Sequence, residues 1–105
     1  MFVLISKAGP SRARAAVQEP QNLSQLHVEL RGVSESAARE ALAAAGLGQV
    51  EGEHARLSVK ALRSAAKGGT GSDWSRRFDA MLDAAQRQGH ADDKLTRVRA
   101  NVVRT

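Results

Sequence analysis

The sequence predicts an α+β fold, a two-layer sandwich in which helices pack on one face of a four-stranded, mostly antiparallel sheet. Some segments alternate apolar and polar residues, as a half-buried strand does. Others repeat apolar residues at the three- and four-residue spacing of a helix. The length of 105 residues suits one compact unit, so we expect a single domain over residues 1–105 with the order β-β-α-β-α-α-β.

The first third of the chain predicts two strands with a loop between them. Residues 2–6 form a continuous apolar run, which indicates a buried strand. Residues 25–31 alternate apolar and polar side chains, which indicates a strand with one face on the core. Residues 8–22 show no clear period and end in a Pro- and Asn-containing turn signal. We therefore expect a loop there, with one helical turn at 12–17 as the alternative.

A helix, a third strand and a short helix follow. Ser34 is expected to cap the first of these helices, because a serine hydroxyl satisfies a free N–H at a helix start, and Gly46 or Gly48 ends it. The apolar face of this helix is nearly all alanine, so it should lie close to the sheet. Residues 54–58 alternate as a strand whose final serine is the expected cap of a helix at 59–66.

The last third predicts an amphipathic helix and a final strand. The helix starts at Ser72 or Asp73 and ends at Gly89, and residues 95–103 then alternate as a strand. Trp74 begins the apolar stripe of the helix and is expected to be at least partly buried. The predicted core comprises Leu26, Val28, Leu30, Ala41, Leu42, Leu57, Phe78, Met81, Leu82, Val98 and Val102.

A winged-helix-like architecture is the alternative. The order from the helix at 34–46 onward matches helix-strand-helix-helix-strand, and the final strand would then be a wing. Arg76 and Arg77 would enter a major groove from the start of a recognition helix. The two N-terminal strands and the apolar Trp74 in that helix argue against this order.

The charge balance favours anionic partners. Lysines and arginines number 16 against 11 acidic residues, for a formal net charge of +5, and the whole excess lies in residues 53–105. Arginine outnumbers lysine twelve to four, and its planar guanidinium pairs with carboxylates and phosphates through two hydrogen bonds. The same Ala- and Arg-rich composition also arises in a GC-rich bacterial genome without selection for binding.

Several classes of protein are excluded or disfavoured by what the chain lacks. Without cysteine there is no disulfide scaffold, thiolate zinc site or cysteine nucleophile. No apolar run approaches 18 residues, so no membrane span is expected. The opening apolar run is too short for a signal peptide, and we expect a cytoplasmic protein.

No motif in the sequence points to catalysis or to a cofactor. The glycine-rich residues 67–72 precede a helix but lack the spacing of a phosphate-binding P-loop. His27, His54 and His90 are not spaced as metal ligands, so neither a metal nor another cofactor is expected. The sequence therefore favours a protein without catalytic activity, and it leaves open an enzyme whose site is assembled from scattered residues.

The strongest candidate for a binding site is the exposed face of the sheet. If the strands containing them are neighbours, His27 and His54 would face each other on it, and the arginines on this face would repel one another. We expect an anion to offset that charge, whether Glu29 paired with an arginine across a strand, a bound anion, or a partner's acidic surface. The candidate binding residues are His27, Arg31, His54, Arg56, Arg97, Arg99 and Asn101.

From these observations we expect a small non-catalytic binding or regulatory module that acts through protein contacts, including contacts with a second copy of itself in a homodimer. One alternative is a nucleic-acid-binding protein that uses Arg76, Arg77, Arg97 and Arg99. The other is a small enzyme or ligand carrier whose site lies on the exposed sheet face. Aromatic residues make up only 3% of the chain. Few side chains are therefore available for nucleic-acid bases to stack on, which disfavours binding of single-stranded nucleic acid.

Overall fold

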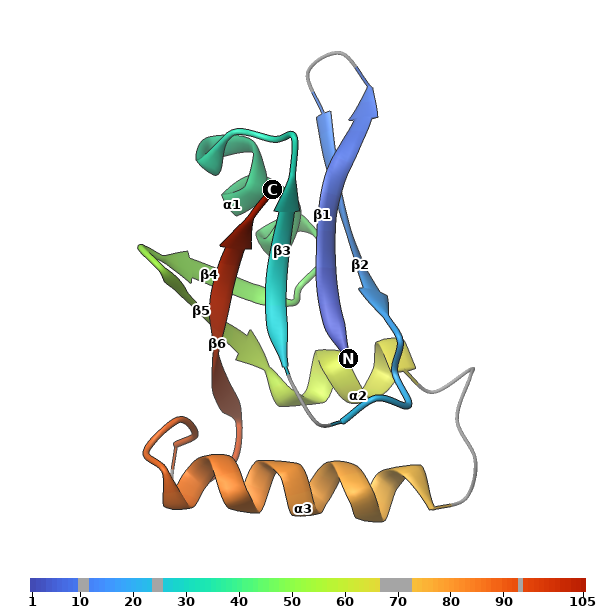
Figure 1. Cartoon of the computed structure of the whole chain (residues 1–105), viewed down its shortest axis with the longest axis vertical. Coiled ribbons are helices and arrows are strands. Elements are labelled where there is room, and N and C mark those ends of the chain that lie inside the picture. The colour runs from blue at the N-terminus through green and yellow to red at the C-terminus, as the bar shows by residue number, and fades with distance from the viewer. Residues whose placement is uncertain (10–11, 24–25, 67–72, 93) are drawn as a thin grey trace.

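In the part of the chain that the structure describes, six strands form one curled sheet in the order β2-β1-β3-β6-β5-β4, and three helices pack around it (Figure 1). The computed structural model describes residues 1–9, 12–23, 26–66, 73–92 and 94–105. In chain order the elements are β1 (Phe2–Gly9), β2 (Arg12–Gln18), β3 (His27–Arg31), α1 (Glu35–Ala44), β4 (Gly48–Glu51), β5 (His54–Ser58), α2 (Val59–Ala66), α3 (Trp74–Arg87) and β6 (Arg97–Arg104).

The α+β class is confirmed, but the expectation of four strands is wrong. The four predicted strands are β1, β3, β5 and β6, and the sheet gains β2 and β4. Residues 12–18 of the stretch expected to be a loop or a helical turn form β2, which pairs antiparallel with β1 so that Val17 lies opposite Val3. Its alternation was hard to see because the inward positions of β2 are mostly alanine. Residues 12–18 are a strand because they pair with β1, which is strongly apolar.

The sheet is also mixed rather than mostly antiparallel. β3 runs parallel to β1, and β6 runs parallel to β3. The pairs β1–β2, β5–β6 and β4–β5 are antiparallel. Because β2 occupies one edge of β1, β3 takes the other edge, and β6 then fills the place between β3 and β5. A central position for β6 is incompatible with a wing, so the winged-helix-like alternative does not describe this fold.

Two helices cover one face of the sheet. α1 packs on β1, β2 and β4, and α2 packs on β2 and β5. Both expected caps are present: the Ser34 hydroxyl accepts a hydrogen bond from the Ala37 N–H at 3.1 Å, and the Ser58 hydroxyl accepts one from the Ala61 N–H at 3.2 Å. The inward residues of α1 include two alanines, Ala38 and Ala41, which let it lie close to the strands.

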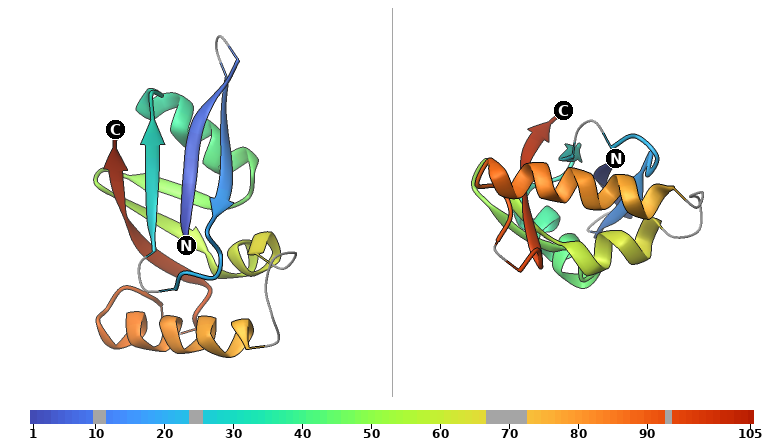
Figure 2. Two further views of the ribbon diagram at one scale, coloured as in Figure 1. Left: turned by 45° about the vertical axis from the view of Figure 1, so that its right-hand side comes forward. Right: turned by 90° about the horizontal axis from the view of Figure 1, so that it is seen from below.

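The third helix, α3, crosses one end of the sheet instead of joining the other two helices (Figures 1 and 2). Its buried residues are Trp74, Phe78 and Leu82, and the Trp74 and Phe78 rings stack with centroids 4.7 Å apart. The Trp74 indole N–H donates to the Pro20 carbonyl oxygen, which ties the helix to the chain that follows β2. Asp73 precedes the helix without a side-chain capping bond. The glycine-rich residues 67–72, including the Ser72 cap, lie outside the described residues.

The predicted core is largely confirmed. Eight of its eleven residues are buried, and Trp74 is buried with them. Three others are half-buried and pack at the margin of the core: Leu26, Met81 and Val102. Leu26 and Met81 lie where α3 meets the end of the sheet, and this position gives them a second role described below.

Candidate functional site

The sheet face opposite α1 and α2 contains most of the residues singled out in the sequence. Asn101 on β6 lies between His27 on β3 and His54 on β5, and each histidine is its direct cross-strand partner. Since neighbouring strands are about 4.8 Å apart, the two histidine backbones are separated by roughly 10 Å. The strands of the histidines are therefore not neighbours, and the two side chains do not form a facing pair.

His27 belongs to a small cluster of its own. The Phe2 ring stacks on its imidazole with centroids 4.9 Å apart and an interplanar angle of 7°. Its Nε2 lies 3.9 Å from Glu29, and the other Glu29 oxygen accepts a hydrogen bond from Arg31 at 2.5 Å. Glu29 thus pairs with an arginine of its own strand, not with one across a strand. Arg31 lies about 20 Å along the sheet from Arg99, by strand geometry, and is not part of the same site.

The remaining arginines do converge. Arg56 on β5 lies directly opposite Arg99 on β6, and Arg97 lies opposite Ser58 on the same pair of strands. These residues line what we call the basic depression, a hollow of about 350 Å³ formed by Arg56, Gly89, His90, Ala91, Asp92, Arg97 and Arg99. Arg56 lies 3.4 Å from Glu51. Neither Arg97 nor Arg99 forms an ion pair with any carboxylate in the described part of the chain.

Asp92 supplies a negative charge to the basic depression, but its carboxylate already accepts hydrogen bonds from Thr96 and Arg97. Its carboxylate accepts hydrogen bonds from the Arg97 N–H at 3.0 Å, from the Thr96 hydroxyl and from the Thr96 N–H at 2.7 Å. The Arg97 N–H and then the Thr96 hydroxyl lower the pKa of Asp92 below its ordinary value. These bonds therefore stabilise the fold above the ordinary carboxyl pKa, and that stabilisation is lost as the pH falls through the lowered pKa.

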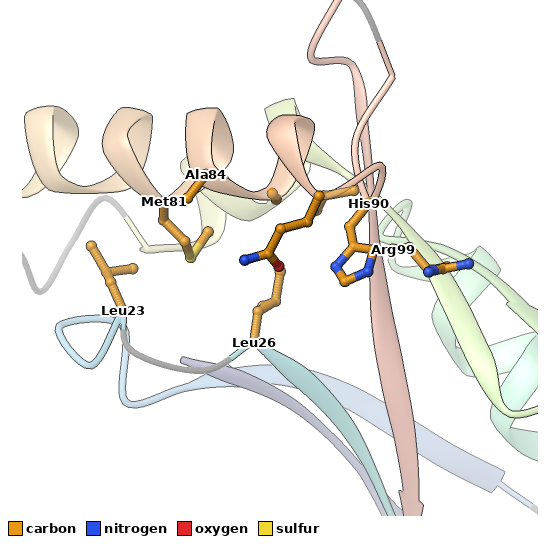
Figure 3. A pocket seen from close by; sticks show the side chains of 9 residues that line it. Leu23, Leu26, Met81, Ala84, His90 and Arg99 are labelled. Carbon is orange, nitrogen blue, oxygen red and sulfur yellow. The ribbon is translucent and has the colours of Figure 1, made fainter.

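A second hollow adjoins the basic depression, where α3 crosses the ends of β3 and β6 (Figure 3). We call it the apolar pocket; its volume is about 290 Å³. His90 and Arg99 line both hollows and stand between them. The apolar pocket is lined by Leu23, Leu26, Met81, Ala84, Ala85, Gln88, His90, Val98 and Arg99.

Sequence reasoning missed the apolar pocket for physical reasons. Leu23 falls between the loop expected at 8–22 and the strand expected at 25–31, where no element was predicted, and Met81 has the helical spacing of a core residue. His90 directly follows Gly89, the expected end of the helix, and precedes the strand expected at 95–103, but only the fold brings it against β6. There the Arg99 N–H donates to the His90 carbonyl oxygen at 2.6 Å. No sequence spacing signals a contact of this kind.

Arg76 and Arg77 do not join the arginines of β6. Arg77 donates to the Gln21 carbonyl oxygen at 2.9 Å, beside the start of α3. The basic depression adjoins the other end of that helix, about 15 Å or more away by helix geometry. The four arginines proposed for nucleic-acid binding therefore form two separate groups on the molecule.

The described residues contain no group of three or more His, Cys, Asp or Glu side chains placed to hold a metal ion. Among the three described helices, none is long and apolar enough to cross a membrane. Comparisons of this chain with family models, with curated proteins and with solved structures find no match. The chemistry available at the site is therefore argued from its side chains alone, and these suit the binding of an anion.

Proposed function

We propose that the protein is a small non-catalytic binding module that docks an acidic segment of a partner protein through its basic depression. One observation carries the proposal: Arg56 and Arg99 are direct cross-strand partners. Like charges placed directly opposite each other destabilise a sheet by a few tenths to about 1 kcal/mol. Glu51, 3.4 Å from Arg56, offsets part of this repulsion, whereas no carboxylate of the described residues pairs with Arg99. An acidic partner relieves this repulsion and gains charge-assisted hydrogen bonds.

The surroundings of this pair support a protein partner. Arg97 extends the positive surface along β6, and its guanidinium forms no ion pair with the described carboxylates. The depression is shallow and open, so it suits a surface-exposed aspartate or glutamate side chain presented by another protein. The residues of the depression come from β5, β6 and the turn after α3, and this sheet scaffold holds them in place.

The test removes the two arginines that have no described ion-pair partner. The R97Q/R99Q double variant is expected to bind a synthetic Glu- and Asp-rich peptide at least about tenfold more weakly than the wild type, measured by fluorescence anisotropy at low salt. Its melting temperature should hold or rise, because the repulsion between Arg99 and Arg56 is gone. The R12Q/R76Q variant, which removes the same charge from two exposed sites elsewhere, is the matched control.

Three outcomes would overturn the proposal. Equal weakening by R97Q/R99Q and by the control would mean that only net charge matters. Tight, steeply salt-dependent binding of random duplex DNA with no binding of the acidic peptide would favour nucleic acid as the partner. A loss of stability above about 2 kcal/mol in R97Q/R99Q would place the arginines in a structural ion-pair network.

Self-association is the second candidate function, and the edge strand β2 favours it. An unpaired strand edge offers its backbone N–H and C=O groups to another chain. In antiparallel pairing of two β2 strands centred on Ala15, Arg12 would lie opposite Gln18 and Arg14 opposite Ala16, so no two arginines would face each other. A hollow of about 390 Å³ along Ala15, Ala16 and Val17 leaves room beside this edge.

Sedimentation velocity tests the β2 pairing directly. At tens of micromolar protein we expect a dimer in the wild type and a monomer in A16R, because the new arginine would face Arg14 of the other copy twice in the dimer. A wild type that sediments only as a monomer, or an A16R variant that still dimerises, would contradict pairing through β2.

A further inference from the structure

We infer that the sheet face opposite α1 and α2 binds a free adenine mononucleotide, with the base beside His27 and Asn101 and the phosphate at Arg99. This goes beyond the protein contacts proposed above, because the ligand is a small molecule and its base lies outside the basic depression. The inference rests on a stacked ring, an exposed amide and an arginine that follow one another along β3 and β6.

The imidazole of His27 is held as a flat surface on this face. The Phe2 ring stacks on one side of it, with centroids 4.9 Å apart and planes 7° apart, and Glu29 lies 3.9 Å from its Nε2. Phe2 belongs to β1, on one side of β3, so the other side of the imidazole is directed toward β6. Figure 1 shows α1 behind β3, with the front of this strand uncovered. A planar base can therefore extend the stack that Phe2 and His27 begin.

A hollow adjoins this uncovered side of the imidazole. Its volume of about 410 Å³ is within the usual range of ligand pockets, about 300–1,000 Å³. Val103 is 42% exposed, the one large apolar side chain that is exposed among the described residues. Covering this side chain with a base removes apolar surface from water, which favours binding. We call this space the outer hollow; it is lined by Leu26, His27, Asn101 and Val103.

Asn101 offers hydrogen bonds that fit adenine. It is exposed, it is the cross-strand partner of His27, and no hydrogen bond joins its amide to another described residue. An amide presents one donor and one acceptor side by side, and adenine presents the matching pair, a ring-nitrogen acceptor beside its amino donor. Guanine has two acceptors at the same positions, so an amide satisfies only one of them. A preference for adenine over guanine follows.

Arg99 is placed to bind the phosphate. It lies two residues before Asn101 on the same face of β6, about 7 Å along the strand. Its guanidinium forms no ion pair with a described carboxylate, and its cross-strand partner Arg56 adds a second positive charge. Guanidinium groups form charge-assisted hydrogen bonds with phosphate oxygens. The ribose of a mononucleotide bridges the gap between Asn101 and Arg99, so one molecule reaches both.

The probe is AMP, compared with GMP, adenosine and ribose 5-phosphate by isothermal titration calorimetry at low salt. We expect AMP to bind at least about tenfold more tightly than each of the other three. No binding of AMP would overturn the inference. Equal binding of GMP would contradict the adenine assignment, and equal binding of adenosine would contradict the phosphate site. Equal binding of ribose 5-phosphate would reduce the site to an anion contact. Tighter binding of a short oligoadenylate than of AMP would make RNA the ligand.

Variants of His27 test the stacking. H27A should weaken AMP binding at least about fivefold, the lower end of the range for losing one base–aromatic stack. H27F keeps a flat ring and should restore most of the affinity. The matched control is H54A, because His54 is the other cross-strand partner of Asn101 but does not line the outer hollow. Equal AMP affinity in H27A and wild type, or equal weakening in H54A, would overturn the placement of the base.

Two further variants test the amide and the arginine. N101A should reduce the preference for AMP over GMP, and an unchanged preference would contradict the hydrogen bonds assigned to Asn101. R99Q should weaken binding of AMP at least about tenfold and leave binding of adenosine unchanged. Equal AMP affinity in R99Q and wild type would contradict the phosphate site.

The nucleotide site and the protein-binding site share Arg99, but they can be separated. His27 lies outside the basic depression and Arg97 lies outside the outer hollow. H27A should therefore leave binding of the acidic peptide unchanged, and R97Q should weaken the peptide but not AMP. Loss of AMP binding in R97Q would place the nucleotide in the basic depression and contradict the outer hollow. A wild type that binds AMP but not the acidic peptide would overturn the protein-binding proposal alone.

Discussion

Replacing Phe78 with alanine is expected to lower the free energy of unfolding by about 3–5 kcal/mol, the range for deleting a fully buried phenylalanine ring. Phe78 is completely buried. Its ring stacks on Trp74, and the Arg63 guanidinium lies over it, 4.9 Å from the ring centroid. Removal of the ring leaves a cavity at the place where α3 meets the rest of the core, and neither Trp74 nor Arg63 can fill it without giving up its own contacts. Urea unfolding followed by Trp74 fluorescence measures the change.

The control for this prediction is Met81→Ala on the same helix. Met81 is half-buried at the margin of the core, so its truncation should cost clearly less than that of Phe78. Both changes place alanine in a helix, so helix propensity favours neither protein over the other by more than a few tenths of a kcal/mol. An unfolding curve for F78A that matches the wild type, or a larger loss in M81A, would show that α3 is not anchored as the structure has it.

Replacing Gly48 with alanine should be about as damaging, by a different mechanism. Gly48 begins β4 with φ at +150°, and a Cβ there would lie 2.0 Å from the Arg56 carbonyl oxygen and 2.9 Å from the Leu57 Cα. Both atoms belong to the backbone of β5, so the two strands must move apart to admit the methyl group. We expect a loss of at least about 3 kcal/mol, combining the unfavourable φ with the steric clash.

Gly52 provides the matched control for Gly48. It also has a positive φ, +67°, but nothing lies within 4 Å of the position its Cβ would take. The G52A variant should therefore show only the conformational penalty, about 1–2 kcal/mol. Urea unfolding of the two variants under the same conditions compares them. If G48A is no less stable than G52A, β4 and β5 do not approach each other as closely as the structure places them.

The sequence predicted the elements with strong local patterns and missed those defined by their neighbours. The alternation of β3 and the caps of α1 and α2 depend only on residues close together in the sequence. Each was therefore predicted close to its observed place. β4 has only four residues and starts with a glycine that is disfavoured in strands, so it carries no such pattern. Its pairing with β5 is a tertiary interaction, and the same is true of β2 and β1.

For the candidate site too, the sequence predicted what local alternation determines and missed what depends on the order of the strands. Alternation correctly placed Arg97 and Arg99 on the face opposite Val98, since a strand fixes which side chains share a side. It could not show that β6 lies between β3 and β5, and this order is what separates His27 from His54 and sets Arg56 against Arg99. The apolar pocket depends on the crossing of α3 over the sheet, which involves residues from three distant parts of the chain.

The central position of β6 also governs how the molecule can assemble. β6 follows every other described strand in sequence, yet it joins β2-β1-β3 to β5-β4, two partial sheets that share no other strand pairing among the residues that the structure describes. His27 and Asn101, partners in the finished sheet, are far apart along the chain. Closing so long a loop has an entropic cost that must be met before the contact stabilises anything, which slows folding. A nascent chain on the ribosome thus exposes the unpaired edges of β3 and β5 until β6 has emerged. This interval is when the protein is most open to aggregation and to chaperones.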